Sequence, residues 1–346
     1  MHSTRGFLYL TNYNLSKINL GSKYVELACD IIFNDEIFDK DGNPSGGDGV
    51  VYKWKSISSA ADISFDGRNK SIYGFYYNDI TTNYGGLFGN YRIKTARNLT
   101  FESVYVASRM NFGVVGRYAN IVENVDVLSG GILGGNTVGG IIAACKIIRN
   151  CSNYAFINFF EQETLSSGYI GGIVGRNIPD EDISIENCNN YGNMKVSTNS
   201  GGIVGICGSA ANVKIYNCKN YGSIDGAKYG FAGIMGYSTA KGTAFIENCF
   251  NFGKISCSSE GGNSSSAAGI VGRITGGATT IKNCANMTTL FVSEGGDIVG
   301  QLSTEYTEIN ESILQIVDCN FEQKQNSLIA YLDSNANGDM TIKIKN

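Results

Sequence analysis

The stretch "GGIVG" at residues 201–205, followed by "VKIYNCKNYGSI" at residues 213–224, decides the fold because both parts recur along the chain. Near copies of the second part, "ISIENCNNYGNM" and "AFIENCFNFGKI", begin thirty residues earlier and thirty-one residues later. A cysteine placed at the same point of each unit suits a disulfide framework, a metal site, a row of nucleophiles or simple packing.

The glycine motif occurs eight times, and each copy is followed by a motif that ends in Cys, Leu or Val. The last residues of these second motifs are 26, 26, 37, 30, 31, 35 and 35 residues apart. A unit of about 26 residues fits one rung of a parallel β-helix, is too short for a propeller blade and lacks helical periodicity. We therefore predict an all-β, right-handed parallel β-helix of about ten rungs, with three short strands per rung.

The repeats also divide the chain. Residues 1–5 are expected to be an added leader, residues 6–80 the N-terminal rungs or cap, and residues 81–320 the repeat rungs. Residues 321–346 are expected to form a last rung or a capping strand pair that covers the open end, as solenoids require. We interpret the whole chain as one elongated domain.

Composition excludes several classes of function. The net charge of −4 argues against a partner of nucleic acid or anionic lipid. The sequence has no apolar stretch long enough to cross a membrane and no layout of a signal peptide at its start. The 45 Gly against 2 Pro, with only 17% charged residues, are typical of a β-rich solenoid.

Stacking the rungs in register turns each repeated residue into a column. The cysteine column contains Cys151, Cys188, Cys218, Cys249, Cys284 and Cys319. Leu99 and Val125 hold the same position, so we interpret the column as apolar, inward-facing packing. The sequence offers no close cysteine pairs for zinc, and its one His, His2, is too remote to activate a nucleophile.

Three further columns flank the cysteines. Two residues after them come Asn153, Asn190, Asn220, Asn251 and Asn286, which we expect to turn the bend and to hydrogen-bond from rung to rung. Another Asn column directly precedes the cysteines, and we expect it to face outward or into the bend. The aromatic column Tyr154, Tyr191, Tyr221 and Phe252 ends at Met287, which favours an interior stack over a carbohydrate-stacking strip.

These motifs resemble the GLUG-type repeats of large bacterial surface proteins, including adhesin-like proteins and non-catalytic regions of some immunoglobulin A-cleaving proteases. The resemblance covers roughly residues 20–320 and rests on Gly-Gly-Ile-Val-Gly, Ile-Glu-Asn-Cys and Asn-Tyr-Gly. It implies a parallel β-helix and a stalk or presentation role at the cell surface or outside the cell. Fold by itself does not fix function.

Two insertions, after residues 151 and 249, break the period and are expected to leave the same edge about three rungs apart. The candidate binding residues on them are Phe159, Phe160, Glu161, Tyr169, Glu260 and Asn263. Two segments offer oxygen ligands for Ca²⁺, namely Asp39 and Asp41, and Asp333, Asn335 and Asn337. We interpret both segments as turns and expect no cofactor.

The sequence leaves three functions open. The first is a non-catalytic module for adhesion or ligand presentation, with a host or microbial glycan or surface protein as partner. The second is a polysaccharide-active lyase or hydrolase, although acidic residues such as Glu123, Glu186 and Glu247 indicate a solvated face. The third is a structural spacer that associates end to end.

Overall fold

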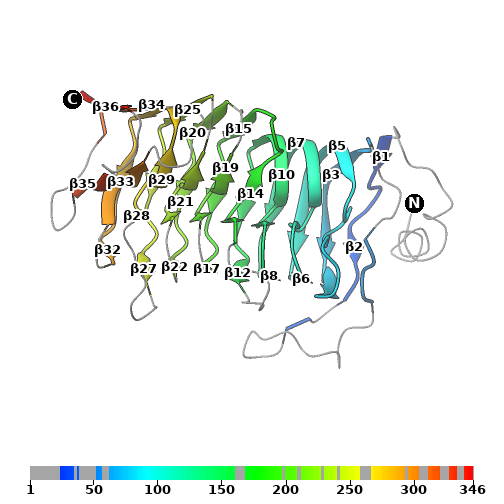
Figure 1. Cartoon of the computed structure of the whole chain (residues 1–346). Helices are drawn as coiled ribbons and strands as arrows, with labels where there is room; N and C mark the ends of the chain where they lie inside the picture. The colour runs from blue at the N-terminus through cyan, green and yellow to red at the C-terminus, as the bar shows by residue number, and fades with distance from the viewer. Residues whose placement is uncertain are drawn as a thin grey trace.

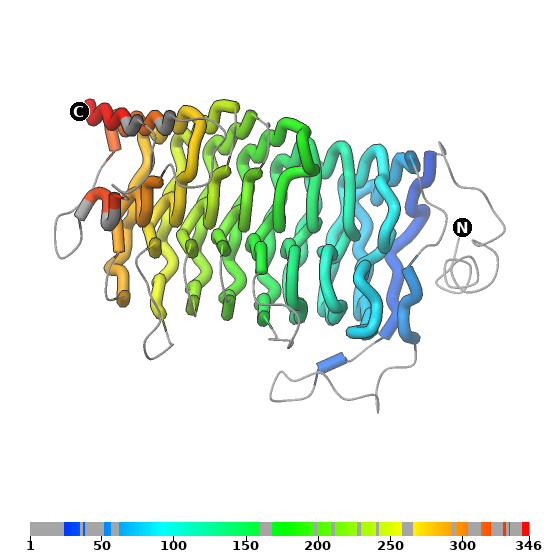
Figure 2. The backbone as a smooth tube through the Cα atoms, viewed as in Figure 1, coloured from blue at the N-terminus to red at the C-terminus, as the bar shows by residue number. Residues whose placement is uncertain are grey.

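The computed structural model winds as coils of β-strand that stack along one axis (Figure 1). It describes residues 24–34, 37–38, 52–56, 62–159, 168–196, 199–208, 212–226, 230–239, 242–257, 266–292, 295–303, 311–319, 327–332 and 339–345. The described backbone advances steadily from one end of the stack to the other (Figure 2). This architecture agrees with the predicted parallel β-helix, while the right-handed winding and the count of about ten rungs stay predictions.

One coil shows the plan of the rest. β13 (Ile170–Gly171) and β14 (Val174–Asn177) cover the glycine motif, and β15 (Ile183–Glu186) and β16 (Asn189–Asn190) cover the cysteine motif. β17 (Met194–Val196) follows the Asn-Tyr-Gly bend. This coil therefore has five strands where three were expected. A bend at the glycine motif divides the first expected strand, and a left-handed Asn divides the second.

The remaining strands follow the same order. Those before this coil are β1 (Tyr24–Glu26), β2 (Ile31–Ile32), β3 (Ser64–Tyr73), β4 (Tyr76–Asp79), β5 (Arg92–Glu102), β6 (Val104–Ser108), β7 (Gly116–Val127), β8 (Gly130–Gly134), β9 (Val138–Gly139), β10 (Ile142–Arg149), β11 (Ser152–Asn153) and β12 (Phe156–Phe159). The next ten are β18 (Ser200–Gly201), β19 (Val204–Cys207), β20 (Val213–Tyr216), β21 (Lys219–Asn220), β22 (Ile224–Gly226), β23 (Phe231–Ala232), β24 (Met235–Ser238), β25 (Thr243–Glu247), β26 (Phe250–Asn251) and β27 (Ile255–Cys257). The last are β28 (Ala267–Ala268), β29 (Val271–Thr275), β30 (Gly277–Lys282), β31 (Ala285–Asn286), β32 (Leu290–Phe291), β33 (Gly295–Ser303), β34 (Glu311–Val317), β35 (Ser327–Leu332) and β36 (Asp339–Lys345).

Each strand pairs in parallel with its counterpart in the next coil. Ile185 aligns with Ile215, and Ile215 aligns with Ile246. The third face forms a separate sheet of eight strands that runs from β4 to β32. Equivalent residues therefore stack along the axis, which is the arrangement that the column interpretation requires.

The chain's last two strands decide between the two alternatives expected for its end, a last rung or a capping strand pair. β35 pairs in parallel with β33, and β36 pairs in parallel with β34 over residues 311–317 and 339–345. They continue the winding as a further rung and do not form a capping strand pair. The reason is that residues 339–345 supply seven consecutive partners for the ladder of the preceding coil.

The cysteine column lies in the core. Cys151, Cys188, Cys218, Cys249 and Cys284 have no exposed surface, and Cys319 is 8% exposed. The equivalent Leu99 and Val125 are buried as well, which agrees with the packing interpretation. The ten cysteines are free thiols. Burial raises the pKa of the Cys188 and Cys249 thiols well above their usual value, so both stay neutral.

The bend is made by a different Asn column from the one expected. The residues directly before the cysteine position have φ between 50° and 55°: Asn98, Asn124, Asn150, Asn187, Asn217, Asn248, Asn283 and Asp318. Asn and Asp tolerate this left-handed conformation better than other residues with a side chain. The outer amides also connect coils, since Asn217 Nδ2 donates to Asn187 Oδ1 at 2.7 Å.

Asn217→Gly is expected to preserve more stability than Asn217→Ala. Both variants lose the exposed amide bond, but only glycine adopts φ of 52° without a steric penalty. The alanine variant should be less stable than the glycine variant by about 1 kcal/mol, the cost of a left-handed residue with a Cβ. Chemical denaturation of the two variants measures this difference, and equal midpoints would contradict the bend assignment.

The Asn column that was expected to turn the bend is buried instead. Asn190 Nδ2 donates to Asn220 Oδ1 at 2.9 Å, and Asn220 Nδ2 donates to Asn251 Oδ1 at 2.8 Å. The expected hydrogen bonds from rung to rung are thus present, but in the core. A Cβ on Gly202 would lie 2.4 Å from Asn220 Cγ, so the second glycine of the motif makes room for this amide.

Candidate functional site

The predicted loop residues are only partly placed by the structure. Phe159 ends β12, and Tyr169 lies directly before β13. The Tyr169 ring lies 6.0 Å from the Arg176 guanidinium, and Phe159 lies against Gly168. Phe160, Glu161, Glu260 and Asn263 lie outside the described residues. β12 and β27 belong to the same sheet with β17 and β22 between them, so both insertions begin at one edge, three coils apart.

The Ca²⁺ candidates, Asp39, Asp41, Asp333, Asn335 and Asn337, also lie outside the described residues. Within the described ranges, no group of three or more His, Cys, Asp or Glu side chains is placed to hold a metal ion. The same ranges contain no helix of the length and apolarity needed to span a membrane.

The aromatic column is exposed, which corrects the expected interior stack. Tyr154, Tyr191, Tyr221 and Phe252 are 44%, 36%, 40% and 42% exposed. Successive rings stack nearly parallel, with centroids 4.2, 4.8 and 5.0 Å apart. The bend turns this position away from the core, and the spacing of the rings follows the spacing of the coils.

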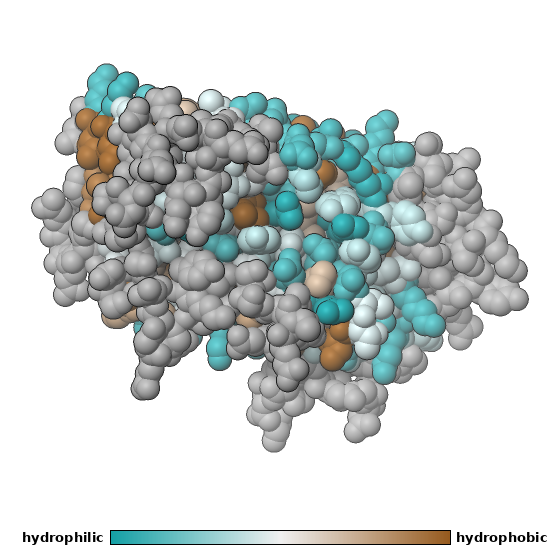
Figure 3. Space-filling view, in the orientation of Figure 1, coloured by the Kyte–Doolittle hydropathy of each residue, from teal (hydrophilic) through white to brown (hydrophobic). Residues whose placement is uncertain are grey.

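This stack is a poor platform for sugars despite its exposure. A sugar binds an aromatic side chain through the face of the ring, but the faces of Tyr191 and Tyr221 are covered by their neighbours. Only the ring edges reach solvent along the middle of the column. On the face drawn in Figure 3, the described residues are mostly hydrophilic, with a few separate apolar patches. We therefore assign the column a stabilising role on the outside of the solenoid.

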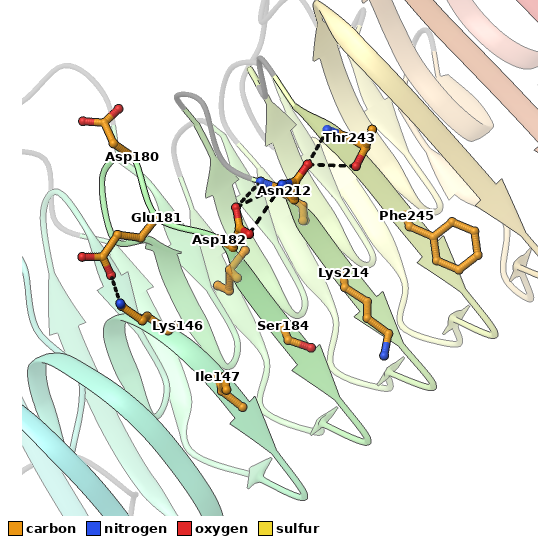
Figure 4. A pocket seen from close by; sticks show the side chains of 12 residues that line it. Lys146, Ile147, Asp180, Glu181, Asp182, Ser184, Asn212, Lys214, Thr243 and Phe245 are labelled. Atoms are coloured by element: carbon orange, nitrogen blue, oxygen red, sulfur yellow. Dashed lines mark hydrogen bonds and ion pairs between the residues drawn. The ribbon is translucent and has the colours of Figure 1, made fainter.

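A groove on another face is the better candidate for a site (Figure 4). It has a volume of about 750 Å³ and crosses β10, β15, β20 and β25. Its floor is the outward column formed by Ile147, Ser184, Lys214 and Phe245, which are aligned coil by coil. The floor therefore has two polar side chains in the middle and one apolar side chain at each end.

One wall of the groove is a hydrogen-bonded row across three coils. The backbone N–H of Asn212 donates to Asp182 Oδ1 at 2.7 Å. The backbone N–H and the hydroxyl of Thr243 donate to Asn212 Oδ1 at 3.1 and 3.0 Å. These contacts join the three coils of the wall to one another.

The loop at residues 178–182 closes the end of the groove nearest the N-terminus. The buried Asn177 holds this loop, because its Nδ2 donates to the carbonyl oxygens of Ile178 and Glu181. The Glu181 carboxylate then accepts two hydrogen bonds from Arg92, at 3.0 and 2.8 Å, and pairs with Lys146 at 3.0 Å. The loop is thus tied to β5 and β10 of earlier coils.

Two carboxylates, Glu181 in the groove and Glu186 beside it, are held in the ionised form by cationic partners. Hydrogen bonding from Arg92 lowers the pKa of Glu181, and hydrogen bonding from Lys214 lowers the pKa of Glu186. Glu186 accepts from Lys214 at 2.9 Å and from Ser184 at 2.8 Å. The ion pairs of Arg149 with Glu123 and of Lys282 with Glu247 continue this pattern, which agrees with a solvated face.

Glu181→Gln is expected to lower stability at neutral pH and to have less effect in acid. Because the pKa of Glu181 is lower in the folded protein than in the unfolded chain, its ionised carboxylate stabilises the fold at pH values above the unfolded-state pKa. This stabilisation is lost as the pH falls through the folded-state pKa. The loss should stay below about 1 kcal/mol because the partners are partly exposed. Thermal unfolding of the variant and the unmodified protein at neutral and acidic pH measures this loss, with the exposed Asp180→Asn as control. A difference in stability that does not change with pH would contradict the assignment of a lowered pKa to Glu181.

Sequence reasoning missed this groove, although one signal for it was present. From the glycine motif to the cysteine position there are 8 to 10 residues in the first three units and 12 or 13 in the next four. In the first of these four units, the extra residues lie in the turn between β14 and β15, which carries Asp180, Glu181 and Asp182. This smaller, repeated lengthening of the units is the feature of the sequence that indicates the groove.

The fold and this lateral groove define a β-solenoid with an open surface site. No protein-family model matches the chain, and no curated protein matches it. Among solved structures, the chain is similar to a Bacteroides ovatus protein named a "putative immunoglobulin A1 protease", with 21% identity and a TM-score of 0.54. The match covers 74% of each chain. At this identity, the likeness supports the solenoid fold alone.

Proposed function

We propose that this chain is a non-catalytic β-helical module of a secreted or cell-surface bacterial protein, and that it belongs to the GLUG-type repeat proteins it resembles. Its role is adhesion or ligand presentation, with a glycan or surface protein as ligand. The observation that carries the proposal is the groove over β10, β15, β20 and β25, which combines a hydrogen-bonded polar wall with an aromatic floor residue. The setting outside the cell rests on the resemblance of the repeats.

The chemistry of the groove favours binding over catalysis. A glycosidase needs a carboxyl group whose pKa is raised so that it can act as an acid. The pKa values of Glu181 and Glu186 are lowered, and both groups are held by cations. Burial raises the pKa of Asp126 and Asp297, but Asp126 lies on β7 near the aromatic column and Asp297 is buried on β33.

The test is an array of host and bacterial glycans and surface proteins, probed with the purified protein. Ser184→Trp fills the floor of the groove and should abolish the binding that the unmodified protein shows. Ser256→Trp places the same side chain on the eight-stranded sheet and should leave binding intact. Depolymerisation of a bound glycan that stops when one groove carboxylate is replaced would instead establish the polysaccharide-active alternative.

A further inference from the structure

We infer that the groove takes a neutral oligosaccharide whose sugar rings lie along the solenoid axis. This inference rests on the proposed function and narrows the ligand of the same site. Three properties of the groove support it, namely its length, the side chains that line it and its net charge.

The groove has the shape of a track along the axis. Its floor residues, from Ile147 to Phe245, come from four successive coils. Coils are spaced about 4.8 Å apart, so the floor is roughly 14 Å long. The volume of about 750 Å³ lies within the range of small-ligand sites. An extended chain of a few sugar rings matches this form better than a compact ligand does.

The lining offers both kinds of contact that a sugar ring makes. The half-buried Phe245 ring stacks on no other aromatic ring of the described residues, so its face is available to the C–H face of a sugar. The Lys214 ammonium has three N–H donors, of which one is directed at Glu186. The hydroxyls of Ser184 and Thr243 donate within the protein and keep lone pairs to accept.

The charge of the groove selects a neutral chain. Among the lining residues, Lys146 and Lys214 stand against Asp180, Glu181 and Asp182, which gives 2 − 3 = −1. Both lysines are already paired with carboxylates. A uronic acid or sulfated chain would therefore bring like charge to the groove without meeting an uncommitted cation.

An extended peptide fits the groove less well. Peptides usually add to a sheet through the free hydrogen-bonding groups of an edge strand. Here the floor is the face of a sheet, and β20 is paired on both sides, with β15 and with β25. The backbone of the floor therefore has no free hydrogen-bonding groups for a peptide strand. A ligand of this groove must be recognised by side chains, which is how sugars are recognised.

The experiment is calorimetric titration with gluco-, manno- and galacto-hexasaccharides, with an oligogalacturonate of equal length and with a hexapeptide. At least one neutral hexasaccharide should bind, and Phe245→Ala should weaken it about tenfold, the effect of losing one ring contact. Phe291→Ala removes a ring that is 55% exposed on the other sheet, and it should leave affinity unchanged. Circular dichroism verifies that each variant is folded.

The outcomes separate this inference from the proposed function. Binding of the galacturonate or the peptide alone, lost in Ser184→Trp, would overturn the neutral-sugar assignment and leave the binding module standing. Neutral-sugar binding that Phe245→Ala does not change would overturn the placement of the sugar on this ring. No binding to any of these probes would overturn this inference, and an empty array in addition would overturn the proposed function.

Discussion

Cys218→Asp is expected to destabilise the protein by about 4 kcal/mol, because it places a carboxylate in the core without a cationic partner. Cys218 has no exposed surface, and its Sγ lies 3.3 Å from the Tyr216 carbonyl oxygen and 3.7 Å from that of Ile185. A carboxylate there would face two acceptors and gain no donor. Chemical denaturation at neutral pH measures the loss.

Cys218→Val is the matched control for this prediction. Val125 occupies the same column and is fully buried, so the core already accepts this side chain at the equivalent position. The cost should be about 1 kcal/mol or less, as for other swaps of similar volume. If the valine variant lost as much stability as the aspartate variant, the thiol itself would have a role that packing does not explain.

The inward direction of the cysteine column could be predicted because the sequence contains its own substitutions. Leu99 and Val125 stand where the other rungs have Cys, and only an apolar site accepts all three residue types. The parallel winding could be predicted for a related reason. A repeat of one strand-bend unit leaves few ways to bury its apolar face other than stacking.

The two Asn columns could not be told apart by residue type. Asn suits a left-handed bend and also suits a buried amide ladder. The residue type at positions 217 and 220 therefore does not show which of the two makes the bend and which forms the ladder. The backbone decides between them, because Cys218 faces the core and Asn220, two residues later in the short β21, faces the same way. The residue before the cysteine is then left to make the bend.

The aromatic column and the groove needed the three-dimensional register. Met287 at the end of the column suggested an interior position, but it is 58% exposed like the rings before it. The groove depends on Glu181 reaching Arg92, which is 89 residues away in sequence. Such a contact follows from how far a loop folds back over earlier coils, and repeat spacing does not contain that information.

Asn220→Asp is the second change with a large expected effect, about 3 kcal/mol or more at neutral pH. The substitution keeps the shape of the side chain but replaces the amide group that donates to Gly222 O at 2.9 Å and to Asn251 Oδ1 at 2.8 Å. The new carboxylate would face both of these acceptors in a fully buried position. Leaving buried polar groups unsatisfied costs about 1–3 kcal/mol each, and more where a charge is involved.

The pH dependence of Asn220→Asp has a definite sign. Burial raises the folded-state pKa of the introduced carboxyl group above its unfolded value, so the variant should recover stability as pH falls. Asn217→Asp makes the same change three residues earlier, in the exposed outer column whose left-handed φ Asp tolerates, and should cost less than about 1 kcal/mol. Denaturation of both variants at neutral and acidic pH tests this prediction. Equal losses of stability at the two positions would show that the buried amide ladder does not hold the coils in register. A large loss confined to position 220 assigns that role to the ladder from Asn153 to Asn286.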